Sequence, residues 1–574
     1  MVISDVTQQL VDSDFYVRSL GLRQLKGITR PVEVFAVDRP RYAGARLDAE
    51  RYRRAGLVGR DQSTERLLTA WGTVRATETA PGATFLVVGE AGIGKTRLVA
   101  EVRDGVAASG GEVLGAGCLP YYSNVALWPI AQMLERSVGI VGTESNRLGA
   151  LLDHLEGLSM DLPTTVPFLA PLLGMTDTPG YPVPELDPSA FLDETLNRLV
   201  DWVASLAATR PHLLIIEDLH WADPSTLGML GRLAARRAPR LLTIVTTRDD
   251  TMVLWRDAAE VVELGRLDDE SSSTLVDKLV AEQDLSPELR ASIVDRADGI
   301  PLFIEELTRS CLEAEGGEEP LPLRLQELLM GRLKAPGLDL RIAQVAATVG
   351  PTFEASTVAA VVGDGPRVTD QLARLAEEGI IEPGDHGTDT YRFRHALLRD
   401  AAYETQVLEA RSQTHAKVAD TIAELGGAAA LVAQHLDLAG EHDRAVAQYL
   451  VAAQVEQGRG AHTEATRLLS RALELMERLA ESDGRDLSEL TARMLRGLSV
   501  SSTQGYAAPD VQADHRRAEF LATRLGTRPE VLPSLIAIWA YWLVSGDLAT
   551  ARGLIERLNE MVRMPEYSWF APEV

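Results

Sequence analysis

The chain has 574 residues, of which 45% are hydrophobic and 24% charged, so it can bury several hydrophobic cores and is not disordered throughout. Its 57 basic and 83 acidic residues give a net charge of −26, which excludes a chain-wide field that attracts nucleic acid. Cys118 and Cys311 are too few for a disulfide framework, the first residues lack a secretory signal, and no apolar run reaches the roughly 20 residues of a membrane span. These features predict a multidomain cytoplasmic protein.

Residues 1–38 have the alternating pattern of a short strand-rich piece, most clearly over residues 31–37. Residues 39–55 contain six arginines and few large apolar side chains, which is the composition of a solvated linker. Contact of this arginine-rich stretch with an acidic partner is the alternative.

An α/β domain is predicted over residues 56–265. A buried-strand run at 85–88 leads into a glycine-rich turn and a helical pattern at 96–102, and further strand-like runs occur at 213–216 and 241–246. Strands separated by helices predict a parallel sheet covered on both faces. Residues 121–206 read as a largely helical insertion with a proline-rich break at 179–188, and no chemistry is assigned to it.

Residues 266–319 are predicted to form a helical lid that ends in a polar hinge at 313–320. Over residues 320–405, helical patterns at 323–333, 341–349 and 369–378 precede a hairpin centred on 384–387, which predicts a winged helix. A wing that reads DNA carries basic residues near its tip, whereas this one offers Asp385, His386 and Asp389. A packing role for this module is therefore favoured over DNA binding.

Residues 406–574 are helical in pattern and rich in alanine. The segments 440–445, 460–465 and 546–551 each place an alanine five positions after a glycine at the start of a helix, and small residues there allow paired helices to approach closely. The pattern predicts TPR-like helical repeats. Chance recurrence in an alanine-rich chain is the alternative, because the spacing of the three segments is irregular.

One motif specifies chemistry directly. Between the first strand and its helix stands a full phosphate-binding (Walker A) sequence, Gly89-Glu90-Ala91-Gly92-Ile93-Gly94-Lys95-Thr96. Its glycines permit a loop whose backbone N–H groups point at phosphate oxygens, and the helix N-terminus adds partial positive charge. Lys95 would reach the β- and γ-phosphates, and the Thr96 hydroxyl would bind Mg²⁺. The alternative is a glycine-rich turn without a ligand.

A second acidic element follows the strand at 213–216, in the form of Glu217 and Asp218. We expect Glu217 to hold Mg²⁺ through its water shell and Asp218 to orient and deprotonate the attacking water. This order is the reverse of the commoner Asp then Glu, which leaves the rate of hydrolysis open. The alternative for Asp218 is a plain helix cap.

These motifs resemble those of the STAND class of signal-transducing ATPases in the AAA+ superfamily, especially the bacterial branch of LuxR-type regulators with large ATPase sensors. The segment 57–60 resembles the family's stretch that lies against the nucleotide base, and residues 217–223 resemble its extended Walker B motif. The resemblance covers about residues 55–565. It implies ATP or ADP with Mg²⁺ as cofactors and a nucleotide-dependent homo-oligomer.

The resemblance also implies roles for residues outside the Walker motifs. Arg248 would sense the γ-phosphate, Pro301 in the turn 299–301 would pack on adenine, and His395 would contact the β-phosphate of ADP. An ordinary helix-ending turn and an ordinary histidine are the alternatives for the last two. The residues expected to bind nucleotide are Gly59, Arg60, Gly89, Glu90, Ala91, Gly92, Ile93, Gly94, Lys95, Thr96, Arg97, Pro301 and His395, with Lys95, Asp218 and Arg248 catalytic and Thr96 and Glu217 at the metal.

The first 40 residues carry a different resemblance. The segments 21–27 and 31–35 are similar to the closing strands of a class III nucleotidyl cyclase domain. The metal-binding and base-recognising residues of that family lie upstream of this segment, so we expect no cyclase activity. LuxR-type members also end in a helix-turn-helix, a pattern that we do not find in the last residues of this sequence. Both ends of the chain therefore look cut relative to the families.

Together these features predict a slow signalling ATPase that acts as a nucleotide-dependent conformational switch in transcriptional or signal-transduction control. The helical repeats would bind an unknown protein or small-molecule inducer, without direct nucleic acid or membrane binding. One alternative is a nucleotide-bound scaffold that does not hydrolyse ATP. Another is a LuxR-type transcription regulator without its DNA-binding domain.

Overall fold

The computed structural model describes residues 2–4, 15–23, 32–40, 56–139, 147–249, 253–280, 285–313, 325–335, 337–384, 389–564 and 567. Most of the predicted linker at 39–55, most of the hinge at 313–320 and the hairpin tip at 385–388 lie outside the described residues.

The N-terminal piece contains three strands, β1 (Val2–Ser4), β2 (Phe15–Arg23) and β3 (Val32–Pro40). They form an antiparallel sheet in the order β1-β3-β2, with Val2 opposite Ala36. This confirms the strand-rich prediction for residues 1–38. The cyclase resemblance of this piece stays a prediction.

A five-stranded parallel sheet forms the centre of the α/β domain. Its order is β5 (Glu112–Gly117), β6 (His212–Glu217), β7 (Leu241–Thr247), β4 (Ala83–Val88) and β8 (Glu260–Glu263). All neighbouring pairs are parallel, so the carboxyl ends of the strands share one edge. The sequence predicted β4, β6 and β7 but missed β5 and β8, because glycines interrupt β5 and glutamates bound the two valines of β8.

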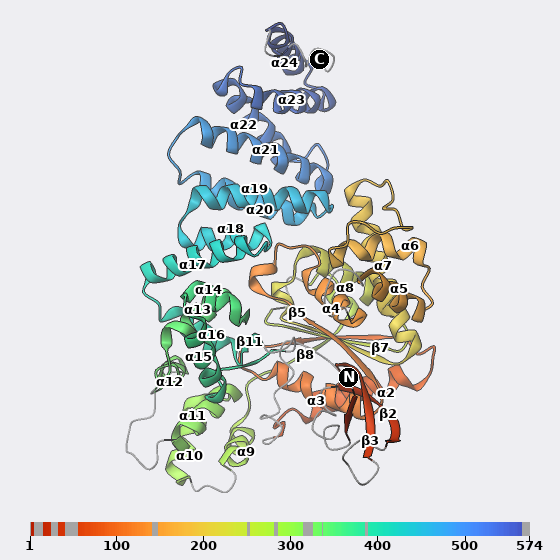
Figure 1. Cartoon of the computed structure of the whole chain (residues 1–574), viewed down its shortest axis with the longest axis vertical. Coiled ribbons are helices and arrows are strands. Elements are labelled where there is room, and N and C mark those ends of the chain that lie inside the picture. The colour runs from red at the N-terminus through yellow and green to blue at the C-terminus, as the bar shows by residue number, and fades with distance from the viewer. Residues whose placement is uncertain are drawn as a thin grey trace.

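Both faces of the sheet are covered by helices, as predicted. Alternate residues of a strand point to opposite sides, and both sets are apolar here, so each face is buried under helices. Helices α2 (Asp61–Ala76) and α3 (Lys95–Ala108) bury one face, which includes Phe85, Leu213 and Ile244. Helices α4 (Trp128–Val138), α7 (Pro188–Thr209) and α8 (Pro224–Arg236) bury the other, which includes Leu86 and Leu214. Figure 1 shows these helices on either side of the strands.

The predicted helical insertion and lid are both present. The insertion contains the short turn η2 (Pro120–Tyr122), α4, α5 (Arg147–Gly157), α6 (Leu162–Leu169), η4 (Ala170–Leu173) and α7. The proline-rich break ends where Asp187 caps the first turn of α7 by accepting a hydrogen bond from the Ala190 N–H. The lid consists of α9 (Asp269–Val280), α10 (Pro287–Ala297) and α11 (Pro301–Glu313) around its own small hydrophobic core.

In its described residues, the next module combines five helices with a small antiparallel sheet. The helices are α12 (Leu325–Leu333), α13 (Leu340–Val349), α14 (Ala355–Val362), α15 (Gly365–Glu377) and α16 (Ala396–Glu404). The sheet has the order β10 (Ile381–Pro383), β11 (Thr390–Phe393), β9 (Thr352–Glu354). The predicted hairpin is confirmed as β10 and β11, whereas α14, α16 and β9 were not predicted.

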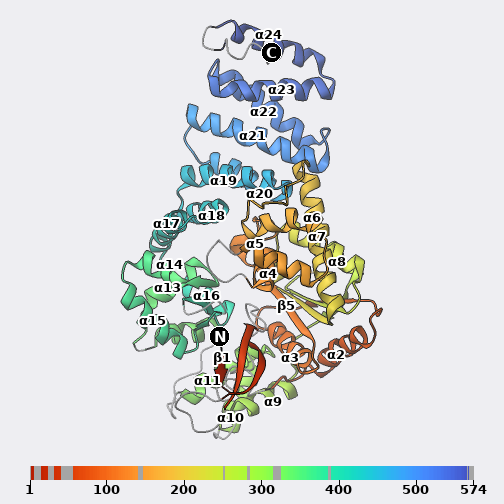
Figure 2. The same cartoon turned by 45° about the vertical axis from the view of Figure 1, so that its right-hand side comes forward.

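The rest of the described chain is a helical array, shown as the blue column in Figures 1 and 2. It comprises α17 (Leu408–Glu424), α18 (Ala429–Ala439), α19 (His442–Gly458), α20 (His462–Met476), α21 (Asp483–Gln504), α22 (Pro509–Leu525), α23 (Leu532–Ser545) and α24 (Leu548–Val562). The alanines of the glycine-to-alanine pattern, Ala445, Ala465 and Ala551, are buried where neighbouring helices pack, as the sequence predicted. Of the helices described, none is long and apolar enough to cross a membrane.

Candidate nucleotide site

The phosphate-binding loop connects β4 to α3 at the carboxyl edge of the sheet. The Gly89 N–H donates to the Thr247 carbonyl at 3.3 Å, which ties the start of the loop to β7. Gly92 and Gly94 have φ values of +78° and +99°, which residues with a Cβ rarely adopt. A Cβ at Gly89 would lie 2.9 Å from both a methyl of Ile93 and the carbonyl of Leu264. The glycines of the motif are therefore required by this loop conformation.

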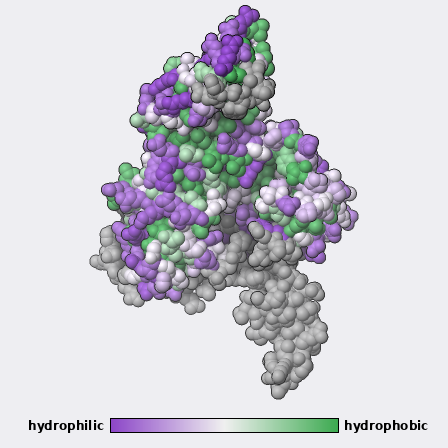
Figure 3. Space-filling view, turned by 45° about the horizontal axis from the view of Figure 1, so that its top comes forward, coloured by the Kyte–Doolittle hydropathy of each residue, from purple (hydrophilic) through white to green (hydrophobic). Residues whose placement is uncertain are grey.

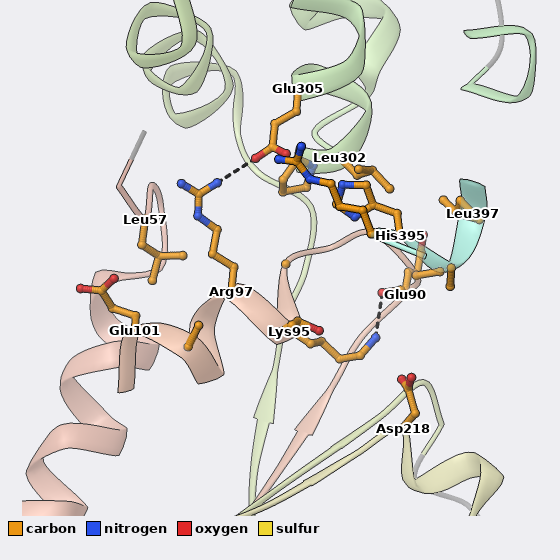
Figure 4. Close-up of a pocket in the computed structure, with 18 of the residues that line it drawn as sticks. Leu57, Glu90, Lys95, Arg97, Glu101, Asp218, Leu302, Glu305, His395 and Leu397 are labelled. Atoms are coloured by element: carbon orange, nitrogen blue, oxygen red, sulfur yellow. Dashed lines mark hydrogen bonds and ion pairs between the residues drawn. The ribbon is translucent and has the colours of Figure 1, made fainter. Parts of the chain in front are cut away.

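Lys95 is the first residue of α3, and its side chain is buried under the loop. Its ammonium group donates to the carbonyls of Gly89 and Glu90 at 2.6 and 2.9 Å. Figure 4 shows this ammonium and the Asp218 carboxylate turned toward one another at the floor of a cavity. The cavity has a volume of about 260 Å³, and its lining includes Lys95, Thr96 and Asp218.

The two acids that follow β6 lie in different surroundings. Asp218 lines the cavity, has a φ of +53°, and its N–H donates to the Thr246 hydroxyl at 3.0 Å. Its side chain makes no capping hydrogen bond, whereas Asp223 caps α8. Glu217 is 2% exposed and lies outside the cavity lining. The helix cap is therefore Asp223, and of the two acids after β6 Asp218 alone lines the cavity.

The cavity is lined by three separate parts of the chain. The α/β domain contributes the loop and Arg248, which follows β7; the lid contributes Pro301 and Glu305 from α11; and the module after it contributes His395. The start of α11 rests on the loop, because the Leu302 N–H donates to the Gly92 carbonyl at 3.4 Å. A ligand that filled this cavity would contact all three parts.

An ion pair links the loop helix to the lid across the mouth of this cavity. The Arg97 guanidinium lies 2.7 Å from the Glu305 carboxylate and also donates to the Gly56 carbonyl at 2.6 Å; the ion pair is drawn dashed in Figure 4. Burial raises the pKa of Glu305 to about 7, although the charges of Arg97 and Arg394 act to lower it. The cost of removing this carboxylate from water therefore exceeds the stabilisation that the two guanidinium groups give it.

Two residues expected at the nucleotide lie behind the loop instead. Gly59 and Arg60 do not line the cavity, whereas Gly56 and Leu57 do. Arg60 donates to the carbonyls of Ile93 and Gly265 at 3.2 and 2.6 Å, so it braces the loop from outside. Ile93 is buried and also outside the lining. The stretch before α2 does reach the cavity, through Leu57 of the segment expected to lie against the base and through the preceding Gly56.

The cavity also contains charged residues that the sequence did not single out, namely Glu101, Arg103, Asp104, Glu305, Glu382 and Arg394. A signal for Arg394 was available, because it stands directly before His395 in the motif used to find that histidine. Glu305 had no comparable signal, since its partner Arg97 lies 208 positions away.

Oxygen atoms that suit Mg²⁺ lie in the cavity beside the phosphate-binding loop. Thr96 and Asp218 both line the cavity near the loop, and hydroxyl and carboxylate oxygens are ligands that Mg²⁺ accepts. Among the described residues, no group of three or more His, Cys, Asp or Glu side chains could hold a metal by itself. The donor set fits an ion that takes its remaining ligands from water and nucleotide phosphates.

Comparison with known proteins identifies the class of this domain. Residues 56–245 match the family described as "AAA ATPase domain", in agreement with the parallel sheet and the phosphate-binding loop. The chain is 25% identical over 601 aligned positions to an uncharacterised protein of Rhizobium meliloti (strain 1021), covering 98% of this chain and 57% of that protein. The chain thus spans little more than half the length of this curated relative.

Solved structures give weaker similarities. A STAND protein with a tetratricopeptide repeat sensor from Pyrococcus horikoshii aligns with a TM-score of 0.42 and 14% identity, over 88% of this chain and 71% of that one. The Aeropyrum pernix ORC1 protein in complex with DNA aligns with a TM-score of 0.33 and 15% identity, over 62% and 95%. These scores are too low to decide function. The chain contains an AAA ATPase domain with a parallel-sheet P-loop core, followed by a mostly helical region.

Proposed function

We propose that this protein is a STAND-type signalling ATPase in which ATP and ADP favour different arrangements of the lid and the winged-helix-like module on the ATPase core. The observation that carries the proposal is the shared cavity, where Lys95, Glu305 and His395 from three parts of the chain line one space. A nucleotide shifts such an equilibrium only if it binds the two arrangements with different affinity. Contact of Arg248 with the γ-phosphate of ATP, and of His395 with the β-phosphate of ADP, would supply that difference.

In this proposal Lys95 and Thr96 bind phosphates and Mg²⁺, Asp218 orients the attacking water, and Arg248 senses the γ-phosphate. Bound Mg²⁺ would supply charge neutralisation at the phosphate oxygens. The helical array, proposed as TPR-like, would bind a protein or small-molecule inducer. Figure 3 shows hydrophobic residues gathered over part of the array surface, and exposed ones among its described residues include Val451, Val455, Leu498, Tyr506 and Phe520.

Small-angle scattering and limited proteolysis with saturating ADP and with saturating ATP test the switch. We expect different scattering profiles and different cleavage patterns in the two states. Identical results at saturation would contradict the switch and leave nucleotide binding intact. Light scattering in the same states tests the nucleotide-dependent homo-oligomer.

A scaffold that holds nucleotide without hydrolysing it is the second candidate. It is favoured by the position of Glu217, which is buried outside the cavity lining and so leaves one acid where hydrolysis of ATP commonly uses two. Phosphate release from ATP separates the candidates, because only the first predicts turnover. A role in transcriptional control and a cytoplasmic location remain predictions from the sequence.

A further inference from the structure

The turn between α19 and α20 brings the helical array against the ATPase core, in addition to a contact in which the ring of His435 on α18 lies 4.9 Å from that of Tyr121 in η2. Figure 2 shows this end of the hairpin beside the core helices. Gly460 lies in the turn with a φ of +77°, and a Cβ there would lie 2.0 Å from the carbonyl oxygen of Pro188 at the start of α7. The contact is therefore close enough to exclude any side chain at this position.

A glutamate from the array completes the first turn of a core helix. The Glu464 carboxylate accepts hydrogen bonds from the Ser225 N–H at 2.9 Å and from the Ser225 hydroxyl at 2.7 Å. Ser225 is the second residue of α8, so its N–H has no partner within the helix. Glu464 is 1% exposed, and its negative charge also faces the positive end of the α8 dipole.

A second glutamate makes a similar contact beside the first. Glu456 accepts a hydrogen bond from the Ala126 N–H at 3.3 Å and pairs with Arg459 at 3.0 Å. The neighbouring donors are satisfied within the core, because Asp223 accepts from the N–H groups of Leu127 and Thr226 at 2.9 and 2.8 Å. Backbone donors of the core are thus divided between a core carboxylate and two carboxylates of the array.

The place of contact is directly connected to the nucleotide cavity. Asp218 lines that cavity, and α8 begins only six residues later, at Pro224. The short stretch between them is held in a single turn, η5 (Leu219–Trp221), closed by a hydrogen bond from the Trp221 N–H to the Asp218 carbonyl at 2.9 Å. Because this connection is short and held in a turn, a displacement of the start of α8 also displaces Asp218.

We propose that the α19–α20 hairpin is a docking element that regulates the nucleotide site, with Glu456 and Glu464 holding the segment from Asp218 to Thr226 in the arrangement seen here. The inference rests on the proposed function, because it assigns regulation to that same site. A ligand or partner that binds the array and withdraws the hairpin would release this segment. In this role Glu464 is a positioning residue, since it acts on the cavity through α8.

Coupling of this kind is reciprocal. If undocking of the hairpin changes the ratio of ADP to ATP affinity, exchange of ADP for ATP must change docking by the same factor. The Ser225 amide reports docking directly, since its hydrogen-bond acceptor comes from the array. The adjacent Thr226 amide, bonded to Asp223 of the core, is an internal reference.

Two glycines make a matched pair for the test. Gly460→Ala places a methyl group against the Pro188 carbonyl, whereas Gly440→Ala, at the end of α18 with nearly the same φ of +78°, meets nothing within 4 Å. Both variants have the same backbone strain, so they differ in contact with the core. We would measure hydrogen exchange at Ser225 and Thr226 without nucleotide, and the ADP and ATP dissociation constants.

The expected result is faster exchange at Ser225 but not at Thr226 in Gly460→Ala, with an ADP to ATP affinity ratio shifted at least about fivefold. Gly440→Ala should match the natural chain in both measurements. Faster exchange at Ser225 with an unchanged affinity ratio would overturn the proposal, and so would unchanged exchange. Should Gly460→Ala fail to fold, Glu464→Ala replaces it, with Glu474→Ala on the exposed side of α20 as its control.

Failure of the proposed function gives a distinct result. If the natural chain bound no nucleotide, both dissociation constants would be unmeasurable while the Ser225 amide still reported docking. Docking in the absence of a nucleotide site would contradict regulation and would leave the hairpin contact as packing alone.

Discussion

The nucleotide cavity and the α19–α20 contact both join segments that are far apart in the chain, but they do so with different chemistry. In the cavity, Arg97 and Glu305 are 208 positions apart and form an ion pair between two side chains. At the hairpin, Glu464 and Ser225 are 239 positions apart, and the carboxylate binds a backbone N–H and a hydroxyl. The first contact requires a particular side chain on each partner, whereas the second joins one side chain of the array to a backbone N–H and a serine hydroxyl of the core.

This difference gives the two regions separate sensitivities. Substitutions in the cavity should alter nucleotide binding and leave the hairpin docked when no nucleotide is present. Substitutions at the hairpin should alter docking directly, and they should alter nucleotide preference through the change in docking. Nucleotide affinity and the protection of the Ser225 amide should therefore respond to different substitutions.

Lys95→Ala should have the largest effect. Removal of the ammonium group from the phosphate-binding loop should reduce ATP affinity by at least about tenfold, because each charge-assisted contact contributes about 1.5–3 kcal/mol. Any phosphate release should fall to background. Calorimetry and a phosphate-release assay provide the measurements, with Lys417→Ala, exposed on α17, as the control.

Lys95→Ala also tests whether the two regions are independent, through hydrogen exchange of the Ser225 amide measured without nucleotide. Protection of this amide should be unchanged in Lys95→Ala, since the array supplies its acceptor. Loss of protection there would show that the two regions are not separable.

Gly299→Ala should have the next largest effect, on stability. Gly299 has a φ of +68°, and a Cβ there would lie 2.2 Å from the Leu267 carbonyl oxygen. Strain of this kind costs on the order of 1–3 kcal/mol, so the lid should shift and its unfolding midpoint in urea should fall. Gly553→Ala in α24, where nothing lies within 4 Å, should be neutral or slightly stabilising. Equal midpoints for the two variants would contradict the packing of the lid turn.

The sequence predicted the parts of both regions that depend on local pattern. It identified the loop at 89–96, the acids after β6, and the helices α19 and α20, because glycine spacing, apolar runs and helical periodicity are local properties. It placed Gly59 and Arg60 at the nucleotide, whereas the structure puts Arg60 behind the loop. It gave no reason to single out Glu305 or Glu464, since their partners are set by the tertiary fold.

A third prediction concerns pH, because each region contains a buried carboxyl group with a raised pKa. Burial raises the pKa of Glu305 to about 7 and that of Glu456 to about 7. A carboxyl with a raised pKa in the closed state stabilises that state fully below its ordinary pKa, and the stabilisation is lost as the pH rises through about 7. Lid closure and hairpin docking should therefore both weaken between about pH 5 and pH 8.

Glu456→Gln separates the two regions in this respect. The groups that face Glu456 at the hairpin are Arg459, Glu464 and Asp223, with His462 and Asp187 nearby, and burial raises the pKa of Asp223 to about 6. The variant should reduce the pH dependence of Ser225 protection, corrected for intrinsic exchange, while Asp223 keeps a part of it. Glu305→Gln should leave that dependence unchanged. If both variants change it equally, the two regions titrate as one unit.

The smallest effect is expected for Arg444→Ala, which removes a charged network from the same hairpin without touching the core. Arg444 pairs with Glu441 and Asp420, and the three side chains are about half exposed. Exposed pairs contribute less than about 1 kcal/mol because water and salt screen them, so the urea midpoint should change little and Ser225 protection should be retained. The variant thus sets the background for Glu464→Ala on the neighbouring helix. If Arg444→Ala loosened Ser225 as much as Glu464→Ala does, docking would depend on the general stability of α19 and α20, and the carboxylate contact at α8 would have no special role.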